Sequence, residues 1–251
     1  MKKSVIVAAL LLLVAGLQTA WAQRIVVTTM DNQVVKFDVS NIKEVSFEEA
    51  VVHEWVDLGL PSHTLWAKCN VGANSPEECG NYFAWGETTP KDNYSWITYK
   101  YSMGSFQTLT KYCYQSDYGY NGFRDNLKEL LPVDDAATAN WGSGWQMPSV
   151  AQQVELINTE YTTTAWTIQN GMYGRLITSN SNGNSIFLPA TGYYEYREDM
   201  STSLRDVGGG HYWSRSLDGS DSAHDLRFAS GGFGCSSYYR ECGLCVRPVR
   251  K

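Results

Sequence analysis

The last forty residues, Tyr212–Lys251, have the sequence YWSRSLDGSDSAHDLRFASGGFGCSSYYRECGLCVRPVRK. Two sets of residues alternate in and just before this segment. The first set is mainly apolar and predicts a fixed framework: Tyr212, Trp213, Ser214, Ala223, Leu226, Phe228, Phe233, Leu244, Val246, Arg247, Pro248 and Val249. The second set mixes many chemistries: His211, Arg215, Asp218, Asp221, His224, Asp225, Arg227, Cys235, Ser237, Tyr238, Tyr239, Glu241, Cys242 and Cys245.

Within this segment, Ala223–Phe228 nearly alternates apolar and charged residues. This pattern is typical of a strand with one dry face. A dry face fixes the register of a strand and leaves the wet face free to carry other side chains. The pattern therefore predicts a rigid scaffold that presents an adaptable surface, and it favours recognition over catalysis.

Residues 1–22 have the features of a cleaved signal peptide. Lys2 and Lys3 precede an apolar run, Val5–Leu17, and Ala20–Ala22 has the small-x-small pattern of a cleavage site. No segment is long enough for a comfortable membrane span. The sequence thus predicts an exported protein that is periplasmic, at the cell surface or secreted.

Cleavage would leave an acidic chain. The formal net charge is −6, and loss of two lysines without any acid brings it to about −8. Such a chain lacks the basic patch that nucleic-acid binding needs, so no nucleic-acid partner is expected.

The remaining chain is predicted to contain a short β extension, residues 23–51, and one domain, residues 52–251. In the extension, strands are expected at residues 24–30, 33–37 and 42–47. High aromatic and glycine content favours a β-rich α+β domain with two short helices and long loops.

The elements expected in the domain are two strands at 56–61 and 64–72, loops over 89–131, helices at 133–140 and 150–158, a hairpin with strands at 166–168 and 172–178, and a strand at 185–189. Ser149 and Gln152 form a capping box for the second helix. Asn170-Gly171 supplies the turn of the hairpin, because this pair adopts the positive φ angles of a type I′ turn.

The cysteines and histidines give no strong sign of catalysis. Six cysteines in an exported protein permit disulfides, and at most one or two bridges are expected because a domain of this size folds without them. Cys242 and Cys245 form a CxxC pattern, but no thioredoxin-like βαβ unit accompanies it, and Cys235 and His224 are the only nearby candidates for a second pair of zinc ligands. No catalytic motif is present, and neither a metal nor a cofactor is expected.

Several motifs in a fixed order resemble the Fibrobacter succinogenes major paralogous domain family. They are VDLGLPS (56–62), LWA (65–67), CNVGA (69–73), FAWGET (83–88), GWQMPS (144–149), IFLPA (186–190), GY (192–193), YWS (212–214) and VRPV (246–249). The family is common in exported proteins of Bacteroidetes. The resemblance implies a C-type lectin-like fold, which formylglycine-generating enzymes and the variable proteins of diversity-generating retroelements share.

The terminal segment also resembles a retroelement variable region. Such elements replace adenines in Asn and Ser codons, an exchange that cannot produce Lys, Gln, Met or Trp. None of these four residues occurs from Arg215 to Cys245, although Glu241 does not fit the scheme. Ordinary drift in exposed loops produces the same mixture, so both explanations stay open.

These features together predict an exported protein without enzymatic activity that binds a protein or glycan ligand outside the cytoplasm. The predicted ligand-binding residues are His211, Arg215, Asp218, Asp221, His224, Asp225, Arg227, Ser237, Tyr238, Tyr239, Arg240 and Cys242. Tyr and Arg dominate binding hot spots, which makes Tyr238, Tyr239 and Arg240 the expected anchors. Arg240 has the alternative role of a buried framework residue. The alternative functions are a structural component of a cell-surface assembly and an oxidase of the formylglycine-generating type.

Overall fold

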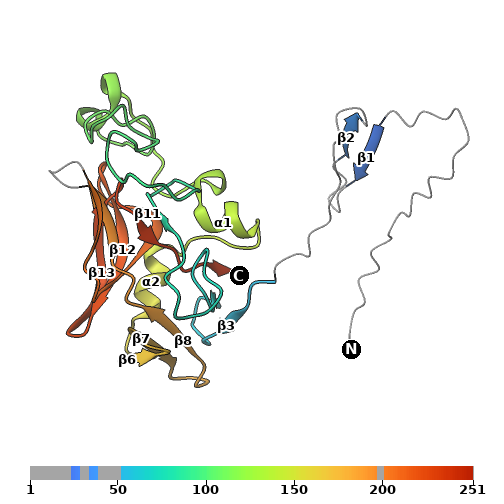
Figure 1. The fold of residues 1–251 in the computed structure, drawn as a ribbon, viewed down its shortest axis with the longest axis vertical. Coiled ribbons are helices and arrows are strands. Elements are labelled where there is room, and N and C mark those ends of the chain that lie inside the picture. The colour runs from blue at the N-terminus through green and yellow to red at the C-terminus, as the bar shows by residue number, and fades with distance from the viewer. Residues whose placement is uncertain (1–23, 29–33, 39–51, 197–200, 251) are drawn as a thin grey trace, which may run out of the picture. The chain divides into compact units, whose positions relative to one another are not determined.

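The computed structural model describes residues 24–28, 34–38, 52–196 and 201–250 (Figure 1). The chain divides into two compact units, residues 1–51 and residues 52–251.

The first unit contains an antiparallel pair of strands, β1 (Arg24–Thr28) and β2 (Val34–Asp38). They correspond to the first two strands expected in the extension. The third expected strand, at 42–47, and the signal peptide, at 1–22, lie outside the described residues.

The second unit is α+β, with many strands and two short helices among its described residues. The strands are β3 (Trp55–Asp57), β4 (Leu65–Ala67), β5 (Tyr82–Phe83), β6 (Thr162–Gln169), β7 (Met172–Ser179), β8 (Ser185–Pro189), β9 (Tyr193–Tyr196), β10 (Thr202–Arg205), β11 (Gly210–Leu217), β12 (Ser222–Ala229), β13 (Gly232–Tyr239), β14 (Leu244–Cys245) and β15 (Val249–Arg250). The helices are α1 (Ala136–Trp141) and α2 (Val150–Leu156).

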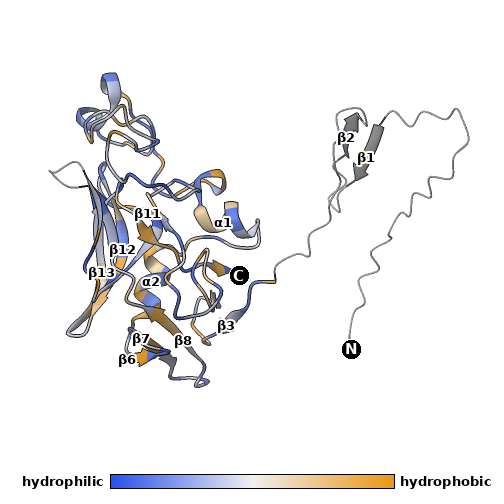
Figure 2. Ribbon diagram, viewed as in Figure 1, coloured by the Kyte–Doolittle hydropathy of each residue, from blue (hydrophilic) through white to orange (hydrophobic). Residues whose placement is uncertain are grey.

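The largest sheet has five strands in the order β13-β12-β11-β14-β5. Two three-stranded sheets, β15-β4-β3 and β6-β7-β8, and the two-stranded sheet β9-β10 accompany it. Helix α2 packs against β11, β12 and β13 (Figure 1). In Figure 2, much of β8 is orange whereas β13 is mostly pale, so the outermost strand of the large sheet is less hydrophobic than β8.

Both faces of the five-stranded sheet contribute to a hydrophobic core. Consecutive residues of β11, Tyr212 and Trp213, belong to different buried clusters, because successive side chains of a strand point to opposite faces. In β12, Ala223 belongs to one cluster and Leu226 to the other. The expectation of a single dry face in Ala223–Phe228 is therefore wrong.

Residues 89–131 form long loops, as predicted, with short 3₁₀ turns at Ser116–Tyr118 and Tyr120–Gly122. Their tyrosines penetrate the core. Tyr94 and Tyr99 are buried, and each hydroxyl donates to a main-chain carbonyl, at 2.6 Å and 2.8 Å. Buried tyrosines usually find such a partner. Side chains of these loops are therefore part of the hydrophobic core.

The predicted capping box at the start of α2 is confirmed. Ser149 Oγ accepts from the Gln152 main-chain N–H at 3.2 Å, and Gln152 Oε1 accepts from the Ser149 N–H at 2.9 Å. The helix predicted at 133–140 is instead a 3₁₀ turn, Pro132–Asp134, followed by α1. The Asp135 side chain accepts from Thr138 N–H, and this cap starts the separate α-helix.

The hairpin β6-β7 is also confirmed. Asn170 and Gly171 have φ angles of 47° and 85°, as a type I′ turn requires. By contrast, β3 and β4 are shorter than the strands expected at 56–61 and 64–72. None of the helices in the described ranges is long and apolar enough to cross a membrane.

Candidate recognition surface

Five side chains project to the same face of β11, β12 and β13, called here the outer face: His211, Asp225, Arg227, Ser236 and Tyr238. The register places His211 directly opposite Arg227 and places Asp225 opposite Ser236. Directly opposed residues of an antiparallel pair project to the same face. The opposite face of these strands packs on α2.

Three of these side chains, His211, Asp225 and Arg227, form a charged group with Asp206. His211 Nε2 is 2.8 Å from Asp206 Oδ2, and His211 Nδ1 is 3.4 Å from Asp225 Oδ2. Arg227 Nε lies 3.6 Å from the same Asp225 oxygen. Asp225 is fully buried, and a buried carboxylate needs nearby positive charge or hydrogen-bond donors. The group therefore holds Arg227 in place.

Tyr238 lies across this charged group. Its ring centre is 5.3 Å from the Arg227 guanidinium carbon and 4.6 Å from the Tyr193 ring, and its hydroxyl is 3.4 Å from Glu195 Oε2. Burial raises the pKa of Tyr238, so the phenol is neutral at ordinary pH. Tyr193 and Glu195 belong to β9, so the antiparallel pair β9-β10 borders the outer face.

Two shallow depressions follow β13, an edge strand of the five-stranded sheet. The first, of about 290 Å³, is lined by Asp206, Arg227, Phe228, Ala229, Gly232, Phe233, Gly234, Cys235 and Ser236. The second, of about 420 Å³, is lined by Ser222, Arg227, Ser236, Ser237, Tyr238 and Tyr239. Arg227 and Ser236 line both, and Tyr239 is 56% exposed. Together the depressions run the length of β13.

Four of the predicted ligand-binding residues are buried, which corrects their assignment to a contact surface: His211, Asp225, Arg240 and Cys242. Within the outer face, the buried Asp225 lies against Arg227 and the buried His211 ring lies against Tyr238. Cys242 belongs to the core cluster around Trp213. The alternation of residue types in the sequence could not predict the burial of these four side chains, because buried clusters pack on both faces of the sheet.

Arg240 was predicted to contact the ligand, but it is fully buried. Its guanidinium donates to Tyr99 Oη at 2.9 Å, to the carbonyls of Tyr112 and Ser220 at 2.9 Å and 2.6 Å, and to the Lys111 carbonyl at 3.0 Å. All four partners belong to loops or turns. Arg240 is thus the buried framework residue that was the alternative reading of this position.

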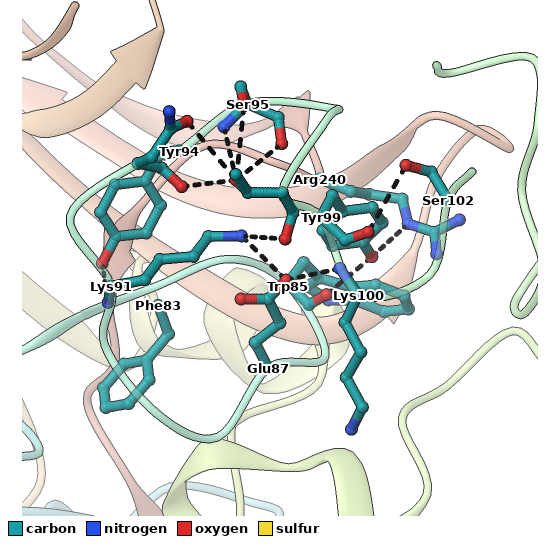
Figure 3. A network of polar contacts seen from close by, with 12 residues as sticks. Phe83, Trp85, Glu87, Lys91, Tyr94, Ser95, Tyr99, Lys100, Ser102 and Arg240 are labelled. Carbon is teal, nitrogen blue, oxygen red and sulfur yellow. Dashed lines mark hydrogen bonds and ion pairs between the residues drawn. The ribbon is translucent and has the colours of Figure 1, made fainter. Parts of the chain in front are cut away.

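Figure 3 shows how this network continues into the loop 87–102. Tyr99 donates to the Trp85 carbonyl, and the Arg240 guanidinium carbon lies 5.1 Å from the Trp85 ring. Glu87 Oε1 accepts from Lys91 Nζ at 2.9 Å and from the Lys100 main-chain N–H at 2.8 Å. The contacts anchor the loop to the end of β13.

The remaining predicted residues are not among the five that define the outer face. Arg215 donates to Glu129 at 2.6 Å and to Gln146 at 2.5 Å, which holds the segment before α2. Asp218 and Asp221 lie between β11 and β12, and His224 Nε2 is 3.5 Å from Asp218 Oδ1. Ser237 and Tyr239 line the second depression together with Arg227 and Tyr238.

Sequence reasoning missed Asp206, Ser236, Tyr193 and the two glycines of the first depression. Asp206 and Tyr193 precede the terminal segment, and only the folded chain brings them to it. The available signal for the glycines was their position inside a strand, which often marks close approach of a ligand or another backbone.

The thiols of the CxxC pattern are not disposed for chemistry. All six cysteines are free, and Cys242 and Cys245 are buried. Burial raises the pKa of both thiols well above the ordinary value. In the described ranges, no group of three or more His, Cys, Asp or Glu side chains could hold a metal ion.

Comparisons of the chain with family models, with curated proteins and with solved structures found no match.

Proposed function

We propose that this protein is an exported recognition protein, and that it binds a ligand outside the cytoplasm through the outer face and the depressions along β13. The scaffold would be the C-type lectin-like fold of the Fibrobacter succinogenes major paralogous domain family, which the sequence motifs resemble. The mixed chemistry of the terminal segment would let related proteins present different surfaces on the same framework.

The observation that carries the proposal is the layered construction of β11–β13. Tyr, Ser and Arg side chains line the depressions, while Asp225 lies 3.6 Å from Arg227 and the His211 ring packs against Tyr238. Tyr and Arg supply large contact areas, and Ser and Gly adapt to the partner, as in antibody paratopes. Binding to a surface held rigid in advance loses less conformational entropy.

The buried thiols weigh against the alternative of an oxidase. A thiolate is the reactive form of cysteine, and burial disfavours it at both Cys242 and Cys245. Among the described residues of the second unit, no contact specifically favours a structural assembly role.

The proposal is tested by replacing Ser236, an exposed residue that lines both depressions, with tryptophan. A phage-displayed library of random peptides and a printed glycan array serve as probes of the mature chain. Ligands selected on the wild type should lose at least about tenfold in affinity for Ser236→Trp, a change of about 1.4 kcal/mol. The added indole would occupy the space of the ligand.

The matched control is Ser143→Trp, an exposed serine in the turn after α1. It should bind the same ligands as the wild type. Equal binding by Ser236→Trp and the wild type would contradict the proposal, as would the absence of any ligand above background.

A further inference from the structure

Strand β13 has one free side. Within the described part of the chain it pairs only with β12. Just past the two strands and in the same register, Arg240 N–H donates to the Asp221 carbonyl at 3.0 Å. Hydrogen-bonded and non-hydrogen-bonded pairs alternate along an antiparallel ladder, so the even-numbered residues of β13 bond to β12. The odd-numbered residues turn their main-chain N–H and C=O groups away from β12; they are Phe233, Cys235, Ser237 and Tyr239.

Nothing in the sequence of β13 blunts this edge. Proteins usually protect an edge strand with proline, with charged side chains or with a bulge. The strand, GFGCSSYY, has neither proline nor a charged residue, and its register with β12 is unbroken over eight residues. The carbonyl of Ser237 accepts from Arg227 Nη2 at 3.3 Å, which leaves it a second lone pair. The edge is therefore a long and regular template for another strand.

The glycines of β13 distinguish it from β6, the other eight-residue edge strand. The sequence of β6, TTTAWTIQ, is also uncharged but contains no glycine. In β13, a Cβ atom added to Gly232 or Gly234 would meet no heavy atom within 4 Å. Neither residue has a left-handed φ, so the backbone conformation does not require glycine there. Glycine inside a strand often marks a place where another backbone approaches closely.

The positions of these glycines suit an incoming strand. An antiparallel strand on the free side would face Gly232 and Gly234 in non-hydrogen-bonded pairs, in which opposed side chains lie closest. Both glycines line the first depression, which has a volume of about 290 Å³. They therefore leave room for large side chains at alternate positions of the added strand.

A second copy of this chain fits the edge less well. The Arg227 guanidinium lies at the Ser237 carbonyl, beside the free side of β13. Two-fold pairing of β13 with itself would bring the same two groups of both copies to one junction. Like charges that meet across a strand pair destabilise it. A segment of a different protein avoids this repulsion.

We propose that an extended segment of a protein ligand adds to β13 as an antiparallel sixth strand of the sheet. Its main chain exchanges hydrogen bonds with Phe233, Cys235 and Ser237, and its large alternate side chains lie beside Gly232 and Gly234. This inference rests on the proposed function and specifies the ligand as a polypeptide, not a glycan. In such complexes main-chain hydrogen bonds give affinity, and recesses for alternate side chains give specificity.

The first test uses peptides selected on the wild-type mature chain from the random library. Each residue of a selected peptide is N-methylated in turn, which removes one N–H donor. In an added strand only alternate N–H groups face β13, so affinity should fall at least about tenfold at every second position and little between them. Losses at consecutive positions, or no loss at any position, would overturn the inference.

The paired variants are Ser237→Pro in β13 and Ile168→Pro in β6. Asn180 N–H donates to the Tyr161 carbonyl at 2.8 Å in the register of β6 and β7, so Ile168 also directs its N–H away from the neighbouring strand. Proline is tolerated at such edge positions. Ser237→Pro removes a donor from the free side and should weaken peptide binding at least about tenfold, whereas Ile168→Pro should bind as the wild type does.

Undiminished binding by a folded Ser237→Pro variant would refute the inference. If this variant does not fold, the N-methylated peptides decide with the wild-type protein. Sedimentation of the mature chain covers the remaining occupant. A dimer that Ser237→Pro dissociates would assign the edge to a second copy and would also overturn the inference.

The same peptides separate this inference from the proposed function. If they lose affinity for Ser236→Trp but show no alternation and bind Ser237→Pro normally, the outer face binds ligands and strand addition is wrong. Selection of glycans without any peptide has the same meaning. If the peptides bind both variants as well as the wild type, the proposed function itself is wrong.

Discussion

Replacement of Arg240 by methionine is expected to lower the free energy of unfolding by about 3–5 kcal/mol. Methionine has a similar stem and no donors, so the carbonyls of Tyr112, Ser220 and Lys111 lose their hydrogen bonds from Arg240. Each buried acceptor left without a partner costs about 1–3 kcal/mol, and local relaxation recovers part of the sum. Urea denaturation followed by tryptophan fluorescence measures the change.

Arg205→Met is the control for the loss of an arginine. Arg205 is 44% exposed and pairs with Glu195 at 2.9 Å on the surface. Removal of such a pair should cost less than about 1 kcal/mol. A similar small cost for Arg240→Met would contradict the framework role and would favour the original prediction that Arg240 contacts the ligand.

Substitution of Glu241 by glutamine is expected to stabilise the protein at pH 8 and to change little at pH 5. Burial raises the pKa of Glu241 from its ordinary value of 4.5 to about 8, and the nearby Asp221 charge adds to the effect. The unfolded chain ionises Glu241 above its ordinary pKa, whereas the folded chain keeps the proton until about pH 8. The contribution of Glu241 to the free energy of unfolding therefore falls as the pH rises from its ordinary pKa of 4.5 to about 8.

The wild type should lose on the order of 3 kcal/mol between pH 5 and pH 8 through this residue, a value reduced from the full shift for local relaxation. Glu241→Gln should lack that part of the pH dependence. Glu160→Gln, at an exposed glutamate, should follow the wild type. Denaturation series at both pH values give the comparison. Parallel curves for wild type and Glu241→Gln would show that Glu241 is not held protonated.

Local patterns in the sequence predicted local structure well. The Ser149–Gln152 capping box and the Asn170-Gly171 turn depend on neighbouring residues alone, and both are present. The β-rich α+β class followed from composition. The length of β4 was less predictable, because β4 also pairs with β15, far along the chain.

The candidate surface was predicted in part. Arg227, Tyr238 and Tyr239 reach the surface near the depressions, but Arg240, in the same run of mixed residues, is buried beneath loops that lie more than a hundred residues earlier in the chain. Burial of Asp225 depends on His211 and Arg227 together, and Asp206 reaches His211 from outside the terminal segment. Such placements require the tertiary fold.

The most direct test of the recognition surface is hydrogen–deuterium exchange of the mature chain with and without a peptide selected from the random library. The account predicts that the bound peptide protects Gly232–Tyr239 of β13 and leaves the loop 96–123 unchanged. Protection confined to that loop, with unaltered exchange in β13, would contradict it.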